Sequence, residues 1–136
     1  MSAGRVGIVL VSHSAALASA AADLARGLAA GGSLAPVAPA GGTEGGGLGT
    51  SADLIAEAAR QVDGGAGVAL LADLGSAVLT VKTLLAEEGD ELPPGCVLVD
   101  APFVEGAVAA VVTASAGGDL DAVRAAAEEA YDYRKR

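Results

Sequence analysis

Two ionisable residues of this chain lie where they could act together as a nucleophile and its partner. His13, the only histidine, follows an apolar run at residues 6–11, and Asp73 follows a second apolar run at residues 68–72. A neutral imidazole is a nucleophile near pH 7. A carboxylate that accepts a hydrogen bond from one ring nitrogen leaves the other nitrogen free to attack. The pair is therefore a candidate for nucleophilic catalysis.

Both residues also have an ordinary structural interpretation. A single histidine is more often a surface or hydrogen-bonded residue, and aspartate commonly starts a turn. Three features favour a catalytic His13. It lies where a strand is expected to pass into a helix, the hydroxyls of Ser12 and Ser14 flank it, and the expected topology brings Asp73 towards it. We therefore predict that His13 reacts and that Asp73 orients it.

Residues that could bind an anion follow both candidates. Gly75 and Ser76 lead into an expected helix, whose first N–H groups favour an anion, and glycine lets a ligand approach the backbone closely. Ser76 could instead cap that helix, and the two roles are compatible. Ser14 is a second candidate, together with the N–H groups around it. The other polar side chains that could line a pocket are Ser12, Thr43 and Thr50.

Several other chemistries lack the residues that they need. One histidine and one cysteine argue against a zinc site and exclude an internal disulfide. The chain has neither the G-x-S-x-G sequence of an α/β-hydrolase nor the G-x-x-x-x-G-K-[ST] sequence of a P-loop. Cys96 falls inside an expected strand and is predicted to be an inert core thiol. No metal or cofactor is expected, and Lys82 is given no role.

The composition is that of a small acidic globular domain. Of the 136 residues, 52% are apolar and 2% aromatic, the mean hydropathy is +0.51 and the net charge is −9. Acidity and the scarcity of aromatic rings argue against binding to nucleic acid or to anionic lipid. We expect one domain over residues 1–136. The single cysteine is consistent with the reducing cytoplasm.

Short apolar runs alternate with helical segments along the chain. Strands are expected at residues 6–11, 34–37, 68–72 and 96–99. Helices are expected after caps at Ser14, Thr50 and Asp119, and over residues 77–88 and 103–116. This order predicts an α/β three-layer sandwich with helices on both faces of a mainly parallel four-stranded sheet, in the flavodoxin-like strand order 2-1-3-4. Such folds bind ligands beyond the carboxyl ends of the first and third strands.

The spacing of apolar residues predicts which side chains of each helix face the sheet. The expected inner faces are Leu17, Ala21, Leu24 and Leu28; Leu54, Ile55, Ala58 and Val62; and Leu120, Val123, Ala127 and Tyr131. The helix at residues 103–116 is apolar nearly all round, which favours a subunit interface. Six glycines within residues 41–49 predict a mobile loop.

The N-terminal apolar run is short for a signal peptide, because Gly7 dilutes it and Ser12 ends it. No uncharged apolar stretch reaches the ~18 residues of a membrane helix. We therefore expect neither a signal peptide nor a membrane span.

Four segments of the chain resemble a known family. They are residues 7–14 (GIVLVSHS), 49–51 (GTS), 72–77 (ADLGSA) and 101–107 (APFVEGA), in the family's order and spacing. The chain resembles the phosphotransferase subunit of the phosphoenolpyruvate-dependent dihydroxyacetone kinase, a member of the mannose-type EIIA fold of the sugar phosphotransferase system (PTS). The V-S-H-S and D-x-G-S-A sequences are specific to the resemblance, whereas the helices between them are not.

The resemblance implies a phosphoryl relay. His13 would carry a phosphoryl group on Nε2, received from phosphohistidine on the carrier protein HPr. The acceptor would be ADP on the nucleotide-binding subunit of the kinase. The resemblance also implies a homodimer, consistent with the apolar helix at residues 103–116. Some members carry HPr-like domains after this one, and we expect this chain to need a separate HPr.

Three alternatives remain open at this point. The chain could be the EIIA component of a mannose-type sugar transporter, or a non-enzymatic dimer whose phosphorylation signals a regulatory state. A Ser-His-Asp hydrolase is a more distant alternative. The fate of the phosphoryl group distinguishes the first two from the kinase subunit.

Overall fold

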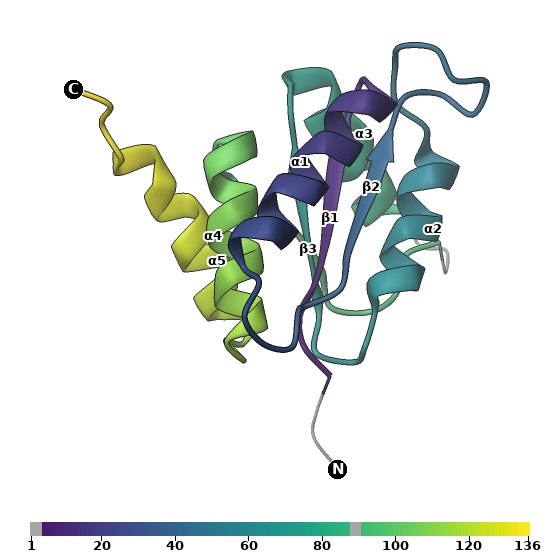
Figure 1. The fold of residues 1–136 in the computed structure, drawn as a ribbon. Helices are drawn as coiled ribbons and strands as arrows, with labels where there is room; N and C mark the ends of the chain where they lie inside the picture. Colours follow the sequence, from purple (N-terminus) through teal and green to yellow (C-terminus); the bar gives the residue numbers. More distant parts are fainter. Residues whose placement is uncertain (1–3, 88–90) are drawn as a thin grey trace.

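The computed structural model describes residues 4–87 and 91–136, which form a sheet between two layers of helices (Figure 1). The strands are β1 (Gly7–Ser12), β2 (Val37–Gly41), β3 (Val68–Ala72) and β4 (Cys96–Leu98). The helices are α1 (Ala15–Leu28), α2 (Ala52–Val62), α3 (Gly75–Ala86), α4 (Phe103–Ser115) and α5 (Leu120–Glu129), and a 3₁₀ turn at Ala130–Asp132 follows. The strand pairs are parallel and the order is β2-β1-β3-β4, which confirms the predicted fold.

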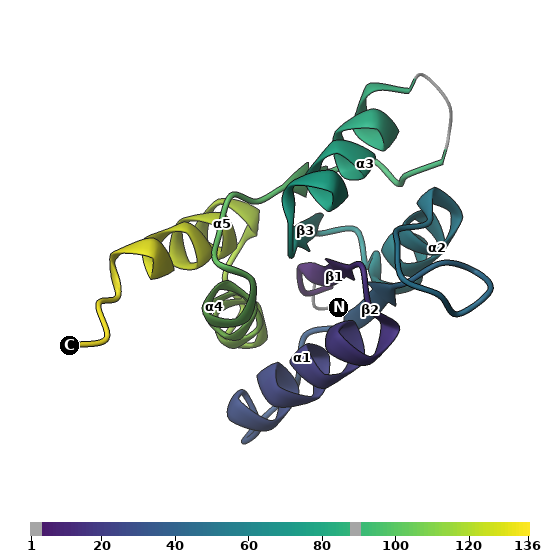
Figure 2. The same cartoon turned by 90° about the horizontal axis from the view of Figure 1, so that it is seen from above.

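Helices cover both faces of the sheet because alternate residues of a strand point to opposite sides (Figure 2). Ile8 and Leu10 of β1 face a core that α1, α4 and α5 complete. Val9 and Val11 face a second core, which α2 and α3 complete. All four side chains are fully buried, as expected for the central position of β1 in a parallel sheet.

The inner face of α1 differs from the prediction. Its buried residues are all alanines, namely Ala18, Ala21, Ala22 and Ala25. Leu17, Leu24 and Leu28 are 42%, 47% and 61% exposed. Small side chains let the helix lie close to the sheet, so the alanines occupy the contact. Because α1 is rich in alanine, apolar residues recur at helical spacing on more than one of its faces. The face that carries the leucines was therefore predicted to be buried, although the alanine face is the buried one.

Strand β2 starts later than the strand predicted at residues 34–37. Its register with β1 pairs Val37 with Ile8. The strand continues through Pro39, which has no N–H to donate and is tolerated because β2 lies at the edge of the sheet. Leu34 lies outside the strand and is 42% exposed.

Two of the predicted helix caps are confirmed and one is wrong. Ser14 and Asp119 each accept a hydrogen bond from the N–H three residues later. Helix α2 is capped by Ser51 and not by Thr50, because the Ser51 hydroxyl accepts from the N–H of Leu54 at 3.2 Å.

Several element boundaries lie close to the predicted ones. Helix α3 starts at Gly75, two residues before the predicted start, because Leu74 has the extended backbone of an N-cap. It ends at Ala86, whereas the predicted end at Glu88 lies outside the described residues. Strand β4 and helix α4 are each one residue shorter than predicted.

The predicted inner faces of α2 and α5 are confirmed in part. The residues buried as predicted are Ile55, Ala58, Val62, Val123 and Ala127. Leu54 and Leu120 are half-buried. Tyr131 is 55% exposed because it lies in the 3₁₀ turn beyond α5.

Helix α4 is apolar on its buried side and on part of its outer side. It buries small residues and one valine against the sheet, namely Gly106, Ala107, Ala110, Val111 and Ala114. Val104 and Val112 remain 41% and 44% exposed. Across the described residues, neither α4 nor any other helix is long and apolar enough to cross a membrane.

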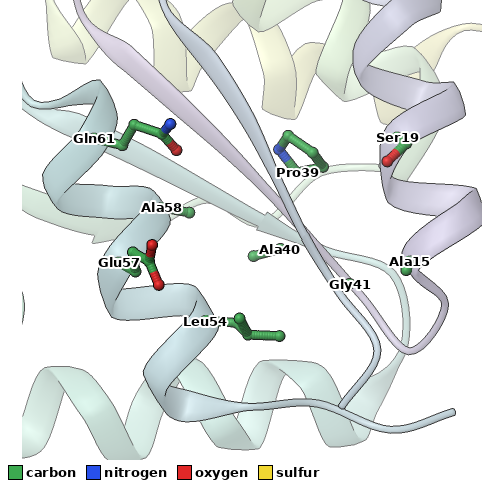
Figure 3. A pocket seen from close by; sticks show the side chains of 9 residues that line it. All are labelled: Ala15, Ser19, Pro39, Ala40, Gly41, Leu54, Glu57, Ala58 and Gln61. Atoms are coloured by element: carbon green, nitrogen blue, oxygen red, sulfur yellow. The ribbon is translucent and has the colours of Figure 1, made fainter. Parts of the chain in front are cut away.

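A groove follows the outer edge of β2 between α1 and α2 (Figure 3). Its volume is about 250 Å³. The helical residues that line it are Leu54, Glu57, Ala58 and Gln61 of α2, and Ala15 and Ser19 of α1. Neither His13 nor Asp73 lines this groove, so it belongs to the open sheet edge and not to the predicted site.

We predict opposite effects from a methyl group added at two glycines. Gly7→Ala should lower the free energy of unfolding by about 1–3 kcal/mol, because its Cβ would overlap the carbonyl oxygen of Val62. Gly27→Ala is the matched control. It has open space in an exposed part of α1 and should raise stability by about 0.5–1 kcal/mol. Urea unfolding measures both, and wild-type stability of Gly7→Ala would contradict the close packing of β1 on α2.

Candidate functional site

The site forms where β1 and β3 end side by side. His13 follows the last residue of β1 and Asp73 follows the last residue of β3, while Val11 pairs with Ala72 in the register. His13 Nδ1 lies 2.9 Å from Asp73 Oδ1. Parallel pairing thus brings together two residues that are 60 positions apart in the sequence, as the topology predicted.

The carboxylate of Asp73 accepts four hydrogen bonds. Oδ1 accepts from the His13 ring and from the N–H of Leu74 at 2.7 Å. Oδ2 accepts from the His13 N–H at 3.1 Å and from the Ser12 hydroxyl at 2.8 Å. The Asp73 side chain is 8% exposed. One buried carboxylate therefore holds both the backbone and the ring of His13.

Two opposing effects act on the pKa of Asp73. Burial raises it, and hydrogen bonds from the His13 N–H, the Ser12 hydroxyl, the His13 ring and the Leu74 N–H lower it. The hydrogen bonds together prevail, so the pKa of Asp73 lies below its usual 3.8. The carboxylate is ionised at neutral pH and only accepts hydrogen bonds.

The ionised Asp73 determines the tautomer of His13. Because the carboxylate cannot donate, Nδ1 carries the proton and Nε2 of the neutral ring carries the free lone pair. Nε2 contacts the hydroxyl of Ser76, and the His13 side chain is 24% exposed. Nε2, the nitrogen predicted to act as the nucleophile, thus lies on the side of the ring away from Asp73.

The first turn of α3 supplies backbone donors next to Nε2. Among the described residues, no hydrogen-bond acceptor contacts the N–H groups of Gly75 and Ser76. There is open space where Gly75 would carry a side chain. Such N–H groups at a helix start favour an anion. The alternative role of Ser76 as a helix cap is wrong, because Leu74 holds the cap position.

Ser12 and Ser14 support the site in a different way from the predicted one. Ser12 is fully buried, and its Oγ accepts from the N–H of Ser14 at 3.0 Å while donating to Asp73. The Ser14 hydroxyl caps α1. Ser12 therefore positions Asp73 rather than lining a pocket. Ser14 was predicted to bind phosphate, but its N–H donates to Ser12 and its hydroxyl accepts from Leu17.

The glycine loop contacts His13 through its backbone rather than through the predicted threonines. The N–H of Gly49 donates to the carbonyl of His13 at 2.9 Å. Thr43 bonds within the loop and Thr50 bonds Thr80 of α3. In the part of the chain that the structure describes, neither side chain bonds the histidine–aspartate pair. Sequence reasoning placed Gly49 in the resembling segment 49–51 but missed its contact with His13, because five other glycines lie in the same loop. The φ of 137° at Gly49 favours glycine.

Cys96 lies in β4, as predicted, and packs against the core formed with α2 and α3. Burial and the charge of Asp63 raise the pKa of its thiol to about 11, so the thiol is protonated at neutral pH. Within residues 4–87 and 91–136, no group of three or more His, Cys, Asp and Glu side chains could hold a metal ion.

The lowered pKa of Asp73 predicts a pH-dependent contribution to stability. A carboxylate whose pKa is depressed by folding stabilises the protein fully above its unfolded pKa of 3.8, and this contribution is lost as the pH falls through the folded value. Asp73→Asn should therefore lower the free energy of unfolding by about 1–3 kcal/mol at pH 7. The difference from the wild type should shrink below pH 3.8.

Urea unfolding of both proteins across this pH range is the measurement. Asp23→Asn is the control, because its carboxylate is 79% exposed and pairs only with Arg26 of the same helix. It should change stability little at any pH. A stability difference for Asp73→Asn that stays constant with pH would contradict the hydrogen-bonded, ionised carboxylate.

Comparison with known proteins identifies the family. The family model EIIA-man, described as PTS system fructose IIA component, matches residues 7–124. The chain is 31% identical over 118 residues to the PEP-dependent dihydroxyacetone kinase 2, phosphoryl donor subunit DhaM, of Listeria innocua, covering 87% of this chain and 93% of that protein. It matches the crystal structure of EF1359, a protein of unknown function, with a TM-score of 0.78 and 31% identity over 93% of this chain and 95% of that one.

Other relatives are much longer than this chain. The phosphoryl donor subunit DhaM of Escherichia coli is 36% identical over 120 residues, which are 87% of this chain and 25% of that protein. The chain thus spans about a quarter of the length of that relative. The region matched by the family model includes both His13 and Asp73. The chain belongs to the EIIA-man family, in its DhaM-type branch.

Proposed function

We propose that this chain is a phosphoryl carrier of the PTS that serves a dihydroxyacetone kinase. His13 accepts a phosphoryl group on Nε2 from phosphohistidine of HPr and passes it to ADP on the nucleotide-binding subunit of the kinase. One observation carries the proposal: Asp73 holds Nδ1, so Nε2 faces Ser76 and the start of α3. The names of the DhaM relatives support the kinase as partner.

Loading uses the lone pair of Nε2. Nε2 attacks the phosphorus of the donor phosphohistidine, a P–N bond forms on His13, and the electron pair of the broken P–N bond returns to the donor ring. The His13 ring becomes positively charged because Nδ1 keeps its proton. The ionised Asp73, whose Oδ1 lies 2.9 Å from Nδ1, stabilises that charge.

Discharge runs through the same atoms. An oxygen of the β-phosphate of ADP attacks the phosphorus, the P–N bond breaks, and its electron pair returns to Nε2. The transferring group spreads negative charge over its three equatorial oxygens. The N–H groups of Gly75 and Ser76, together with the Ser76 hydroxyl, are donors on the Nε2 side that can stabilise this charge.

The placement of Asp73 also limits the repulsion between its carboxylate and a phosphoryl group on His13. A phosphoryl group carries close to two negative charges, so a carboxylate on the same side of the ring would oppose loading. Asp73 instead contacts the opposite nitrogen, and its charge is offset by four donors. Loaded His13 can thus keep its orienting partner.

A sugar-transporter component is the second candidate. The description of the matching family model, a fructose IIA component, favours it. The chemistry at His13 would be the same, and only the acceptor would differ. The acceptor therefore decides between the two candidates.

Phosphorylation should require His13 and depend strongly on Asp73. With phosphoenolpyruvate, enzyme I and HPr, intact-protein mass spectrometry should find one acid-labile phosphoryl group on the wild type and none on His13→Ala. Asp73→Asn should slow loading about 10²–10⁴-fold, because an amide neither holds this tautomer nor stabilises the positive ring. Phosphorus–nitrogen NMR coupling should assign the phosphoryl group to Nε2.

Addition of the ADP-loaded kinase subunit should then discharge the wild-type phosphoprotein. Labelling of His13→Ala would contradict the site, and a phosphoryl group on Nδ1 would contradict the proposed orientation. Phosphorylation without discharge to the kinase subunit would favour the transporter component or a regulatory role.

We also propose that the carrier forms a homodimer through α1 and α4. Apolar side chains of the two helices line a shallow cavity of about 730 Å³, namely the exposed Leu24, Leu28, Val104 and Val112 and the half-buried Val108. The C-terminal segment borders it through Tyr133, and Lys135 pairs with Glu105. An apolar face of this kind is typical of a protein interface, and a second copy of the chain would cover it symmetrically.

Light scattering should report twice the chain mass of 13.0 kDa for the wild type. Leu24→Glu combined with Val112→Glu should produce the monomer while His13 is still labelled. Leu79→Glu is the control, because Leu79 is 66% exposed but lies on α3. A wild-type monomer at high micromolar concentration would contradict the dimer.

A further inference from the structure

The loop after β2 is hydrogen-bonded both to His13 and to α3. The N–H of Gly49 donates to the carbonyl of His13 at 2.9 Å. The next residue, Thr50, has its hydroxyl oxygen 2.9 Å from that of Thr80 in α3, and this contact is partly buried. Both loop residues belong to the segment 49–51 that resembles the family. The proposed transfer at His13 assigns no role to either threonine.

The two threonine hydroxyls form a chain of hydrogen bonds that ends at Ser76. The Thr80 hydroxyl donates to the carbonyl of Ser76, one turn earlier in α3, at 3.1 Å. A hydroxyl has a single hydrogen, so Thr50 is the donor and Thr80 the acceptor in the contact between the two threonines. The chain therefore connects the loop, through Thr80, to the residue whose hydroxyl contacts Nε2 of His13.

These contacts close a ring around the reacting atoms. The loop, His13 and the start of α3 follow the carboxyl ends of β2, β1 and β3, which lie at one edge of the sheet (Figure 1). From Nε2 the ring passes to the Ser76 hydroxyl, from the Ser76 carbonyl through Thr80 to Thr50, and from Gly49 back to the carbonyl of His13. The position of Ser76 relative to Nε2 thus depends on two threonines that do not touch the histidine ring.

The second contact of Thr80 sets it apart from the other threonine of α3. Thr83 also donates to the carbonyl one turn earlier, that of Leu79, at 3.0 Å. A bond of this kind is an ordinary way for a helical threonine to satisfy its hydroxyl. Thr83 is exposed, whereas Thr80 is half-buried and also accepts from the loop. Thr80 is therefore the threonine that connects α3 to the loop.

We propose that Thr80 is a positioning residue for the phosphoryl transfer, which holds the backbone of Ser76 against the loop while the Ser76 side chain moves. This inference rests on the proposed function. A phosphoryl group on Nε2 would occupy the space of the Ser76 hydroxyl, so that hydroxyl must turn away during loading. The backbone donors at the start of α3 must instead stay in place to stabilise the transferring charge. Thr80 suits this task because it bonds the carbonyl of Ser76 and not its side chain.

The removal of single hydroxyl groups tests this role. Thr80→Val removes the hydroxyl and keeps the shape of the side chain, whereas Thr80→Ser keeps the hydroxyl. Thr83→Val is the matched control, because it removes a hydroxyl with the same bond to the preceding turn of the same helix. Rapid-quench measurement of His13 phosphorylation at increasing phospho-HPr gives the maximal loading rate and the half-saturating concentration. Urea unfolding gives the stability of each variant.

Thr80→Val should lower the maximal loading rate about tenfold and change the half-saturating concentration of phospho-HPr less than about twofold, because donors to the transferring group are displaced. Thr80→Ser should restore most of the rate, and Thr83→Val should load like the wild type. Thr50→Val, which leaves α3 unchanged, should also lower the rate. The double variant of Thr50 and Thr80 should be no slower than Thr80→Val, because Thr50 acts through Thr80.

The free protein gives a second measurement that needs no phosphoryl donor. His13 is the only histidine, so nitrogen NMR resonances of imidazole belong to this ring alone. The resonance of Nε2 reports the hydrogen bond that it accepts from the Ser76 hydroxyl. In Thr80→Val this resonance should move towards its value in Ser76→Ala, where the donor is absent. In Thr83→Val it should stay at the wild-type value.

Four outcomes would overturn the proposal. A wild-type loading rate of Thr80→Val would exclude the positioning role, and an equal loss in Thr83→Val would mean that α3 is merely destabilised. Failure of Thr80→Ser to restore the rate would exclude the hydroxyl as the cause. A loss of stability in Thr80→Val with an unchanged Nε2 resonance would indicate a structural role only. Failure of the proposed function is distinguishable, because the wild type itself would then accept no phosphoryl group from phospho-HPr.

Discussion

The hydrogen bonds between Asp73 and His13 determine what the rest of the site can do. One ionised carboxylate accepts from the ring and the backbone of His13, so the position and the tautomer of the imidazole follow from a single group. The buried Ser12 hydroxyl and the Leu74 N–H stabilise that carboxylate. The contacts of Asp73 with Ser12 and His13 would not exist without the parallel pairing of β1 with β3, which is why the sheet order matters for the chemistry.

Small side chains shape the remainder of the molecule. Alanines of α1 and α4 occupy the contacts with the sheet, so helices and strands pack closely, and Gly7 lies against the end of α2. The larger buried residues come mainly from the strands, such as Leu10, Leu70 and Leu71. Several large apolar residues of α1 and α4 lie outside instead, where they form the apolar face along the two helices. A helix that packs through alanines can thus leave its larger apolar residues for contact with another protein chain.

The apolar face along α1 and α4 includes neither His13 nor Gly75 nor Ser76. In the proposed dimer, a stable subunit contact on that face would leave Nε2 of His13 open at the carboxyl ends of β1 and β3.

The sequence by itself determined the element order, the strand order 2-1-3-4 and the convergence of His13 on Asp73. Doubly buried strands are continuous apolar runs, and parallel strands end at one edge. Only the tertiary structure decided the alanine face of α1, the cap at Ser51, the burial of Ser12 and the bond from Gly49 to His13. Each has a physical reason. The spacing of alanines in α1 fits several faces of the helix, and the neighbouring hydroxyls of Thr50 and Ser51 are equivalent caps until the backbone conformation selects one. A hydrogen bond between two backbone groups requires no particular side chain, so the sequence carries no sign of it.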